Sequence, residues 1–299
     1  MQRGGAAVVF SSFIVWYLFL AGVSSGAFIF IAILPVNESI TNPSHIDHQR
    51  ARVAAGYLAV AICAFAASII LLSDFGDPWI TWRVVLTPFA SLASFGACVV
   101  MVFVLVAAAV TVVMLIKPVV PRWAVWLSRL LGIPLAAATM VYAGLLLAGM
   151  LAIDVWHTWL LPVLFVVSSL SCGIAIILFM EAFVPGKDEE GRPPWWKTQF
   201  VLGLLEAAVL AAFIVDRFNF SATAHESIIM LLVGDYALGF WLGIVVLGLV
   251  VPVLLHILYP FARVYALGLA AAVSILIGGF FLRWCVVEIA LYTPFILLS

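Results

Sequence analysis

Eight apolar stretches, each long enough to cross a lipid bilayer, occupy most of this 299-residue chain. The bilayer core offers no water to backbone amides, so a chain dissolved in lipid folds as helices or as a closed barrel. Here the apolar runs are continuous over about 20 residues instead of alternating at every second residue, which favours helices. The predicted spans are residues 10–34, 54–73, 86–116, 130–150, 158–180, 199–215, 233–257 and 264–292.

Composition agrees with a chain that lives in lipid. Only 9% of the residues are charged and 67% are hydrophobic, against about 25% and 45–50% in an ordinary soluble protein. The first apolar stretch is too long for a cleavable signal peptide, so we expect it to remain as the first span. The sequence therefore predicts an all-α membrane protein with eight transmembrane helices. We expect them to form two four-helix bundles, residues 1–150 and 151–299.

Basic residues are distributed unequally between the two sides of the membrane. Nine of them fall in the loops that join spans 1–2, 3–4, 5–6 and 7–8: Arg50, Arg52, Lys117, Arg122, Arg129, Lys187, Arg192, Lys197 and Arg263. The opposite side has only Arg3, Arg83 and Arg217. The positive-inside rule places the nine-residue side in the cytoplasm, so both termini are expected outside. A formal net charge of −1 gives no support for nucleic-acid binding.

The chain offers no obvious ligands for a metal cofactor of its own. The four cysteines fall singly in different spans: Cys63, Cys98, Cys172 and Cys285. Without a Cys-x-x-Cys pair, we expect no iron–sulfur cluster in this chain, and the cysteines are predicted to pack as small apolar residues. The histidines lie in loops or at opposite membrane faces: His45, His48, His157, His225 and His256. Because a transmembrane haem needs facing histidines, we expect no haem.

A few ionisable residues lie within or at the ends of the predicted spans. An ionisable residue at a helix centre costs about 2.5–3.5 kcal/mol on insertion scales, so each needs a reason. Glu206 is inside the sixth span, Asp235 begins the seventh, and Arg283 and Glu288 lie in the outer half of the eighth. Arg283 and Glu288 point in different directions around their helix, so we expect Arg283 to pair with Glu206 or Asp235. The sequence leaves open whether this set is a buried ion pair or part of a proton path.

Polar side chains also gather near the predicted outer face. Asp74 ends the second span, Tyr142 lies in the fourth and His157 follows it. Aromatic residues at this depth are most often interfacial belt residues. An acid, a phenol and an imidazole at similar depth, however, suit a quinone head group, since its carbonyls need hydrogen-bond donors and quinol oxidation needs proton acceptors.

Several motifs occur in an order and spacing that together resemble the NrfD/PsrC-like family, the membrane subunits of polysulfide reductase and related complexes. They are residues 17–27, 48–50, 71–78, 142–146 and 159–173, Glu206, and residues 278–284. The resemblance covers most of the chain. One departure is Ala143, which follows Tyr142 where we would expect a threonine in the family.

The resemblance implies a membrane subunit that has no redox cofactor of its own and binds quinone or menaquinone as substrate. Electrons would pass between the quinone pool and an iron–sulfur subunit at the outer face, joined to a molybdopterin catalytic subunit. The location would be a bacterial or archaeal cytoplasmic membrane. The quinone site is expected in the first half of the chain, formed by Tyr17, Gly22, Asp74, Tyr142 and His157. Asp74 and His157 would act as catalytic proton acceptors.

Two other classes remain open. A secondary transporter built from two four-helix halves would break helices near the membrane centre. Here the prolines lie nearer the helix ends, which weakens that interpretation: Pro88, Pro134, Pro162 and Pro252. A purely structural anchor is the third hypothesis, and the buried Glu206 and Arg283 argue mildly against it.

Overall fold

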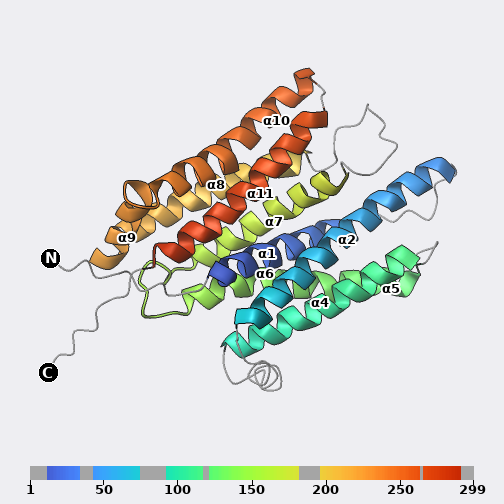
Figure 1. The fold of residues 1–299 in the computed structure, drawn as a ribbon, viewed down its shortest axis with the longest axis horizontal. Helices are drawn as coiled ribbons and strands as arrows, with labels where there is room; N and C mark the ends of the chain where they lie inside the picture. Colours follow the sequence, from blue (N-terminus) through green and yellow to red (C-terminus); the bar gives the residue numbers. More distant parts are fainter. Residues whose placement is uncertain are drawn as a thin grey trace.

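The computed structural model describes residues 12–33, 43–74, 92–116, 121–181, 196–262 and 265–290, and all regular structure in them is helical (Figure 1). The elements are α1 (Ser12–Ile33), α2 (Pro43–Asp74), α4 (Leu92–Ile116), α5 (Arg122–Leu127), η1 (Ser128–Gly132), α6 (Ile133–Ala148), α7 (Leu160–Glu181), α8 (Trp196–Phe218), α9 (Ala222–Leu232), η2 (Gly239–Val250), α10 (Val251–Ala262) and α11 (Tyr265–Glu288). The segments η1 and η2 are π-helical. The predicted all-α fold is confirmed for the described residues.

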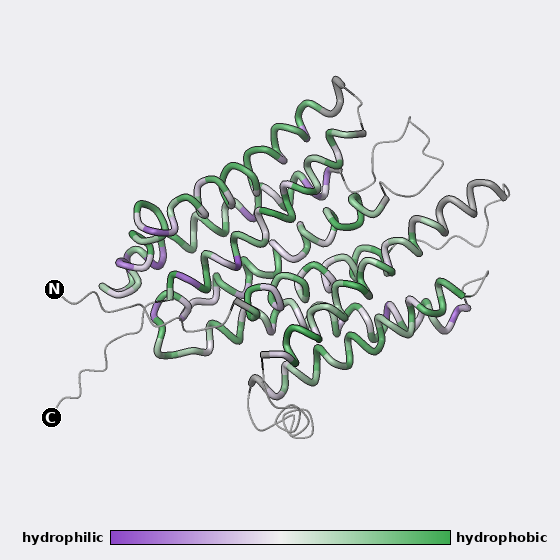
Figure 2. Tube along the Cα trace, in the orientation of Figure 1, coloured by the Kyte–Doolittle hydropathy of each residue, from purple (hydrophilic) through white to green (hydrophobic). Residues whose placement is uncertain are grey.

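Eight helices in the described part of the chain are long and apolar enough to cross a membrane. They are Phe13–Ile33, Val53–Ser73, Ser94–Ile116, Arg122–Ala148, Leu160–Met180, Lys197–Phe218, Gly239–Leu258 and Ala266–Glu288. Hydrophobic residues follow one another along nearly the whole length of these helices (Figure 2). The predicted spans are therefore confirmed, and the protein is a multi-pass membrane protein.

Two boundaries differ from the sequence-based prediction. The fourth span begins at Arg122, not near residue 130, because α5, η1 and α6 continue one another as a single helical rod. Residues 222–232, predicted as part of a loop, form α9, which has 11 residues and is too short to be recognised as a span. Ser221 caps this helix, since its hydroxyl accepts a hydrogen bond from the Ala224 amide at 3.1 Å.

The helices run antiparallel, so the described residues define two ends of the molecule. We call the end that carries residues 149–159, α9 and the last turn of α11 the α9 end, and the opposite end, at which α5 begins, the α5 end (Figure 1). By the predicted topology the α5 end is the basic side.

Helices α1 and α7 lie at the centre of the fold. Helix α1 packs against α2, α6, α7 and α11, and α7 packs against α1, α2, α6, α8 and α11. The two central helices cross at Gly26 and Gly173, where a Cβ atom on either residue would overlap the backbone of the other helix. Helices from the two halves of the chain are thus in close contact at the centre. The division into two four-helix bundles stays a prediction.

Candidate functional site

Two buried tyrosines lie in one apolar cluster of the α9-end half. Tyr17 of α1 is 3% exposed, and Tyr142 of α6 is 8% exposed. Both belong to the same hydrophobic cluster, and the two phenols are close enough to interact electrostatically. The Tyr142 ring fills space above Gly96 of α4, where a Cβ atom would overlap it. The structure therefore brings together two of the residues predicted for a quinone site, although they come from different helices.

Arg283 of α11 is fully buried beside this cluster and is held by neutral groups. Its guanidinium donates to the Leu18 carbonyl at 3.2 Å, the Gly279 carbonyl at 2.8 Å, the Ser168 hydroxyl at 3.2 Å and the Ser169 hydroxyl at 2.9 Å. A charge at this depth is tolerated only when its donors are satisfied. Three helices, α1, α7 and α11, supply these acceptors.

Gly22 leaves the space that Arg283 occupies. A Cβ atom at Gly22 would lie only 2.6 Å from both Arg283 Nη2 and Ser169 Oγ. The rings of Phe19 and Phe165 flank the guanidinium, with centroids 5.8 and 5.6 Å from its central carbon. Gly22, predicted as part of the quinone site, is therefore in direct contact with the buried charge. Through Leu18 and Gly22, α1 connects the Arg283 group to Tyr17.

Glu206 of α8 is 7% exposed and is linked to Arg283 through a serine. Ser168 and Ser171 of α7 face its carboxyl group, and Arg283 interacts with it electrostatically. Since Ser168 also accepts a hydrogen bond from Arg283, the connection is Arg283–Ser168–Glu206. The prediction of a direct pair needs correction: the hydrogen bonds described for Arg283 all go to neutral acceptors, because α7 lies between α11 and α8.

Asp235 and Glu288 lie apart from this buried group. Asp235 is exposed in the turn that precedes η2, so the prediction that it pairs with Arg283 has no support among the described contacts. Glu288 accepts a hydrogen bond of 3.4 Å from the Tyr236 hydroxyl. Partial burial, and then the neighbouring charge of Glu288, raise the pKa of Tyr236 above its ordinary value. The four ionisable residues predicted to act together thus occupy two places.

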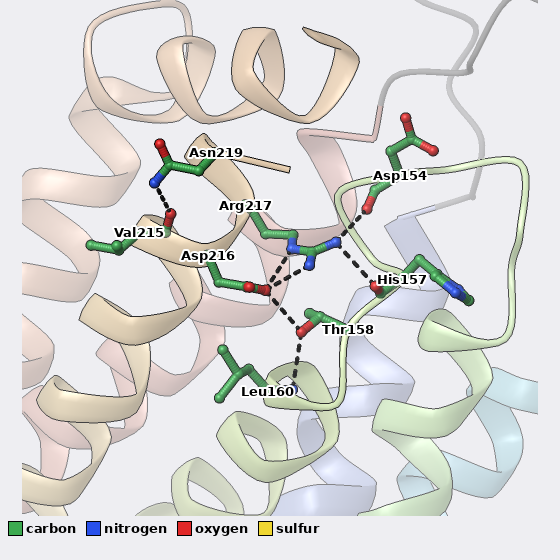
Figure 3. Close-up of polar contacts among 8 residues, drawn as sticks. All are labelled: Asp154, His157, Thr158, Leu160, Val215, Asp216, Arg217 and Asn219. Atoms are coloured by element: carbon green, nitrogen blue, oxygen red, sulfur yellow. Dashed lines mark hydrogen bonds and ion pairs between the residues drawn. The ribbon is translucent and has the colours of Figure 1, made fainter. Parts of the chain in front are cut away.

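Arg217 at the end of α8 holds the loop that contains residues 149–159 (Figure 3). It is 4% exposed, and its Nη1 donates to the carbonyls of Asp154 at 3.1 Å and His157 at 3.0 Å. Asp216 accepts two further bonds at 2.9 and 2.6 Å and also binds the Thr158 hydroxyl at 3.2 Å. Figure 3 shows the exposed His157 imidazole turned away from Arg217. The contacts described for His157 are with Arg217 and Asp154, not with the phenols.

The Asp154 carboxylate joins the same loop to α9. It accepts a hydrogen bond from the Ser221 hydroxyl at 2.7 Å and another from the Thr223 hydroxyl at 2.5 Å. These bonds from Thr223 and Ser221, with a smaller contribution from Arg217, lower the pKa of Asp154 below its ordinary value. On the inner side of the loop, the fully buried Trp156 donates from its indole to the Val286 carbonyl at 2.7 Å. The loop is therefore fixed to α8, α9 and α11.

Several residues predicted from sequence lie outside the described part of the chain. Asp74 is the last residue of α2, but its side chain is not among the described ones. The same holds for the side chains of His45 and His48. Among the described residues, no three His, Cys, Asp or Glu side chains gather so that they could hold a metal ion.

Two groups of the site have no predicted role from sequence: Arg217, and the serines of α7, which resemble an ordinary packing surface. Two signals were nevertheless present. Arg217 is one of few basic residues on the predicted outer side, and it follows Asp216 directly. The serines occur three positions apart, at Ser168 and Ser171, so one face of an apolar helix carries both hydroxyls.

The fold and its buried polar residues define a multi-pass helical membrane protein with charged groups inside an apolar bundle. Residues 3–294 match the family described as Polysulphide reductase, NrfD. The protein belongs to the NrfD family.

Curated relatives agree with this membership. The protein is similar to a membrane-family relative named as a chain of polysulfide reductase in Wolinella succinogenes, with 28% identity over 90% of each sequence. It is also similar to the protein NrfD homolog of Haemophilus influenzae, with 24% identity over 90% of each sequence. The similarity to a subunit of selenate reductase from Mesobacillus selenatarsenatis is 28% identity over 54% of this sequence and 39% of that protein.

Proposed function

We propose that this protein is the membrane subunit of a respiratory oxidoreductase complex and exchanges electrons between the quinone pool and an iron–sulfur partner subunit. The observation that carries the proposal is the meeting of Tyr17 and Tyr142 in one buried cluster beside Arg283. Membership of the NrfD family and the names of the relatives, which are subunits of polysulfide and selenate reductases, support it.

The chemistry of the two phenols suits a quinone. A phenol stays neutral at physiological pH and donates one hydrogen bond, which a quinone carbonyl accepts. The apolar side chains around Tyr17 and Tyr142 suit the ring and tail of such a substrate. Oxidation of the quinol would send its electrons to the iron–sulfur subunit docked at the α9 end, and its protons to Asp74 or His157. A molybdopterin catalytic subunit would complete the complex.

The test is the substitution Tyr142→Phe, which keeps the ring and removes the hydroxyl. Loss of one hydrogen bond costs about 0.5–1.5 kcal/mol, so we expect quinol affinity to fall about 2- to 13-fold. The measurement is quinol-dependent reduction of the partner's iron–sulfur clusters in intact membranes, with an artificial electron donor as control for assembly.

Tyr57→Phe is the matched control variant. Tyr57 of α2 is also buried, at 2% exposure, but lies in a different apolar cluster, against the ring of Phe28. It should leave quinol affinity unchanged. If Tyr142→Phe has no more effect than Tyr57→Phe while the complex stays assembled, Tyr142 does not bind the quinone.

We also propose that the α5 end faces the cytoplasm and the α9 end faces outward, in a bacterial or archaeal cytoplasmic membrane. The basis is the excess of Lys and Arg in the loops of the α5 end. Reporter fusions at Lys187 and Ser299 should give opposite signals, with the cytoplasmic signal at Lys187. The reverse result would place the partner subunits at the α5 end.

The connection Arg283–Ser168–Glu206 is proposed as part of a proton path that serves this reaction. A hydroxyl between a guanidinium and a carboxyl group connects two ionisable groups from different helices without a direct ion pair. Ser168→Ala should interrupt the connection and lower proton-coupled turnover, while Ser24→Ala should not. Ser24 is equally buried but bonds only to the Ala21 carbonyl of its own helix.

A further inference from the structure

A buried amide near the α5 end has only half of its hydrogen bonds in place. Gln199, in the first turn of α8, is 2% exposed. Its Nε2 donates to the Ser171 hydroxyl at 2.7 Å. Its Oε1 has no hydrogen-bond partner within the described ranges of the protein. A buried carbonyl oxygen in an apolar helix bundle is costly unless it accepts a hydrogen bond, so this atom points to a missing donor.

A small cavity lies beside this amide. Its volume is about 10 Å³, close to the space that one buried water occupies. The lining comes from α7, α8, η2, α10 and α11 and includes Ser171, Gln199, Gly203, Gly248, Pro252 and His256. A cavity of this size with several polar groups in its wall holds water, whereas a purely apolar one stays dry.

The histidine in the wall has a defined orientation. His256 is 5% exposed, and its Nδ1 lies 2.6 Å from the Pro252 carbonyl. A carbonyl oxygen only accepts, so Nδ1 carries the proton. In the neutral ring Nε2 is then an acceptor. The polar groups around the cavity are therefore a hydroxyl, an amide oxygen and an imidazole.

We propose that this cavity binds one water molecule, which donates a hydrogen bond to Gln199 Oε1. No other ligand class fits, because the space admits a single non-hydrogen atom with its hydrogens and the amide oxygen requires a donor. Ser171 both lines the cavity and faces the Glu206 carboxyl. The bound water therefore extends the series of polar groups from Glu206 toward the α5 end.

The role of this water rests on the proposed function, but its presence does not. If the Arg283–Ser168–Glu206 connection carries protons, the water is its entry at the α5 end, where it accepts a proton on one side and releases one on the other. No oxidant or reductant takes part in such a relay. Binding of the water can be measured in the protein without quinone or partner subunits, so the two proposals fail separately.

The experiment is X-ray radiolytic labelling of the full-length protein in lipid nanodiscs. Brief irradiation splits bound water into hydroxyl radicals, which modify the side chains next to it. We expect His256 to be labelled in the wild-type protein although it is buried. Gln199→Met keeps the length of the side chain and removes the acceptor, so labelling at His256 should fall about 2- to 13-fold, the factor expected for one lost hydrogen bond.

Gln199→Glu is the matched control, because it keeps an acceptor oxygen at the same position; labelling at His256 should persist. The exposed His157 serves as an internal standard, since its labelling comes from bulk water in every variant. An absence of labelling at His256 in the wild-type protein overturns the proposal, even where a variant does not fold. Equal labelling in the wild type and Gln199→Met overturns it as well.

Discussion

Arg217→Met tests whether the arginine at the end of α8 holds the 149–159 loop in place. The substitution keeps a long side chain but removes every donor. Arg217 donates to two backbone carbonyls of the loop, those of Asp154 and His157. Its bonds to Asp216 matter less, because that side chain is 42% exposed and directly precedes Arg217 in sequence.

The expected loss follows from the two carbonyl bonds. A hydrogen bond to a charged group contributes about 1.5–3 kcal/mol. We take the lower value for each bond because one nitrogen makes both. The sum is about 3 kcal/mol, which corresponds to roughly a 100-fold increase in the opening equilibrium of the loop.

Hydrogen exchange followed by mass spectrometry is the assay, in lipid nanodiscs. The Trp156 and His157 amides bond to carbonyls within the loop, at 3.2 and 3.3 Å, and report its opening. Their protection should fall about 100-fold in Arg217→Met. Arg129→Met is the matched control, since Arg129 donates to the Ala32 carbonyl at the α5 end. Protection that stays within about threefold of wild type would refute the reasoning, because it is less than the smallest single bond assumed here.

Two further outcomes follow from the same contacts. The pKa of Asp154 is lowered in the folded protein, so the stabilisation it gives to α9 is complete above its unfolded pKa of about 3.9. That stabilisation is lost as the pH falls through the lower folded pKa; exchange at the start of α9 should therefore accelerate in acid, and Asp154→Asn should remove this acid dependence. Gly173→Val places a side chain against the Gly26 backbone at the crossing of α1 and α7 and should prevent assembly. Normal amounts of folded Gly173→Val protein in membranes would contradict the described crossing.

The membrane class and the spans follow from the sequence, because hydrophobicity is a local property. A stretch of apolar residues long enough to cross the bilayer must be helical wherever it lies in the fold. The span from Leu160 to Met180 agrees with its predicted bounds to within two residues for that reason. α9 has no such signal, because 11 residues are too few, and its capping residue Ser221 is recognisable only once the helix is known.

The polar contacts were decided by the tertiary structure. The sequence indicates that Arg283 and Glu206 need partners, since a charge in lipid must be compensated. It does not indicate which ones, because the acceptor Leu18 lies 265 positions from Arg283 in the sequence. Only the packing of α7 between α8 and α11 inserts Ser168 between the two charges. Likewise, the meeting of Tyr17 with Tyr142 depends on how α1 and α6 pack, and no local pattern contains that information.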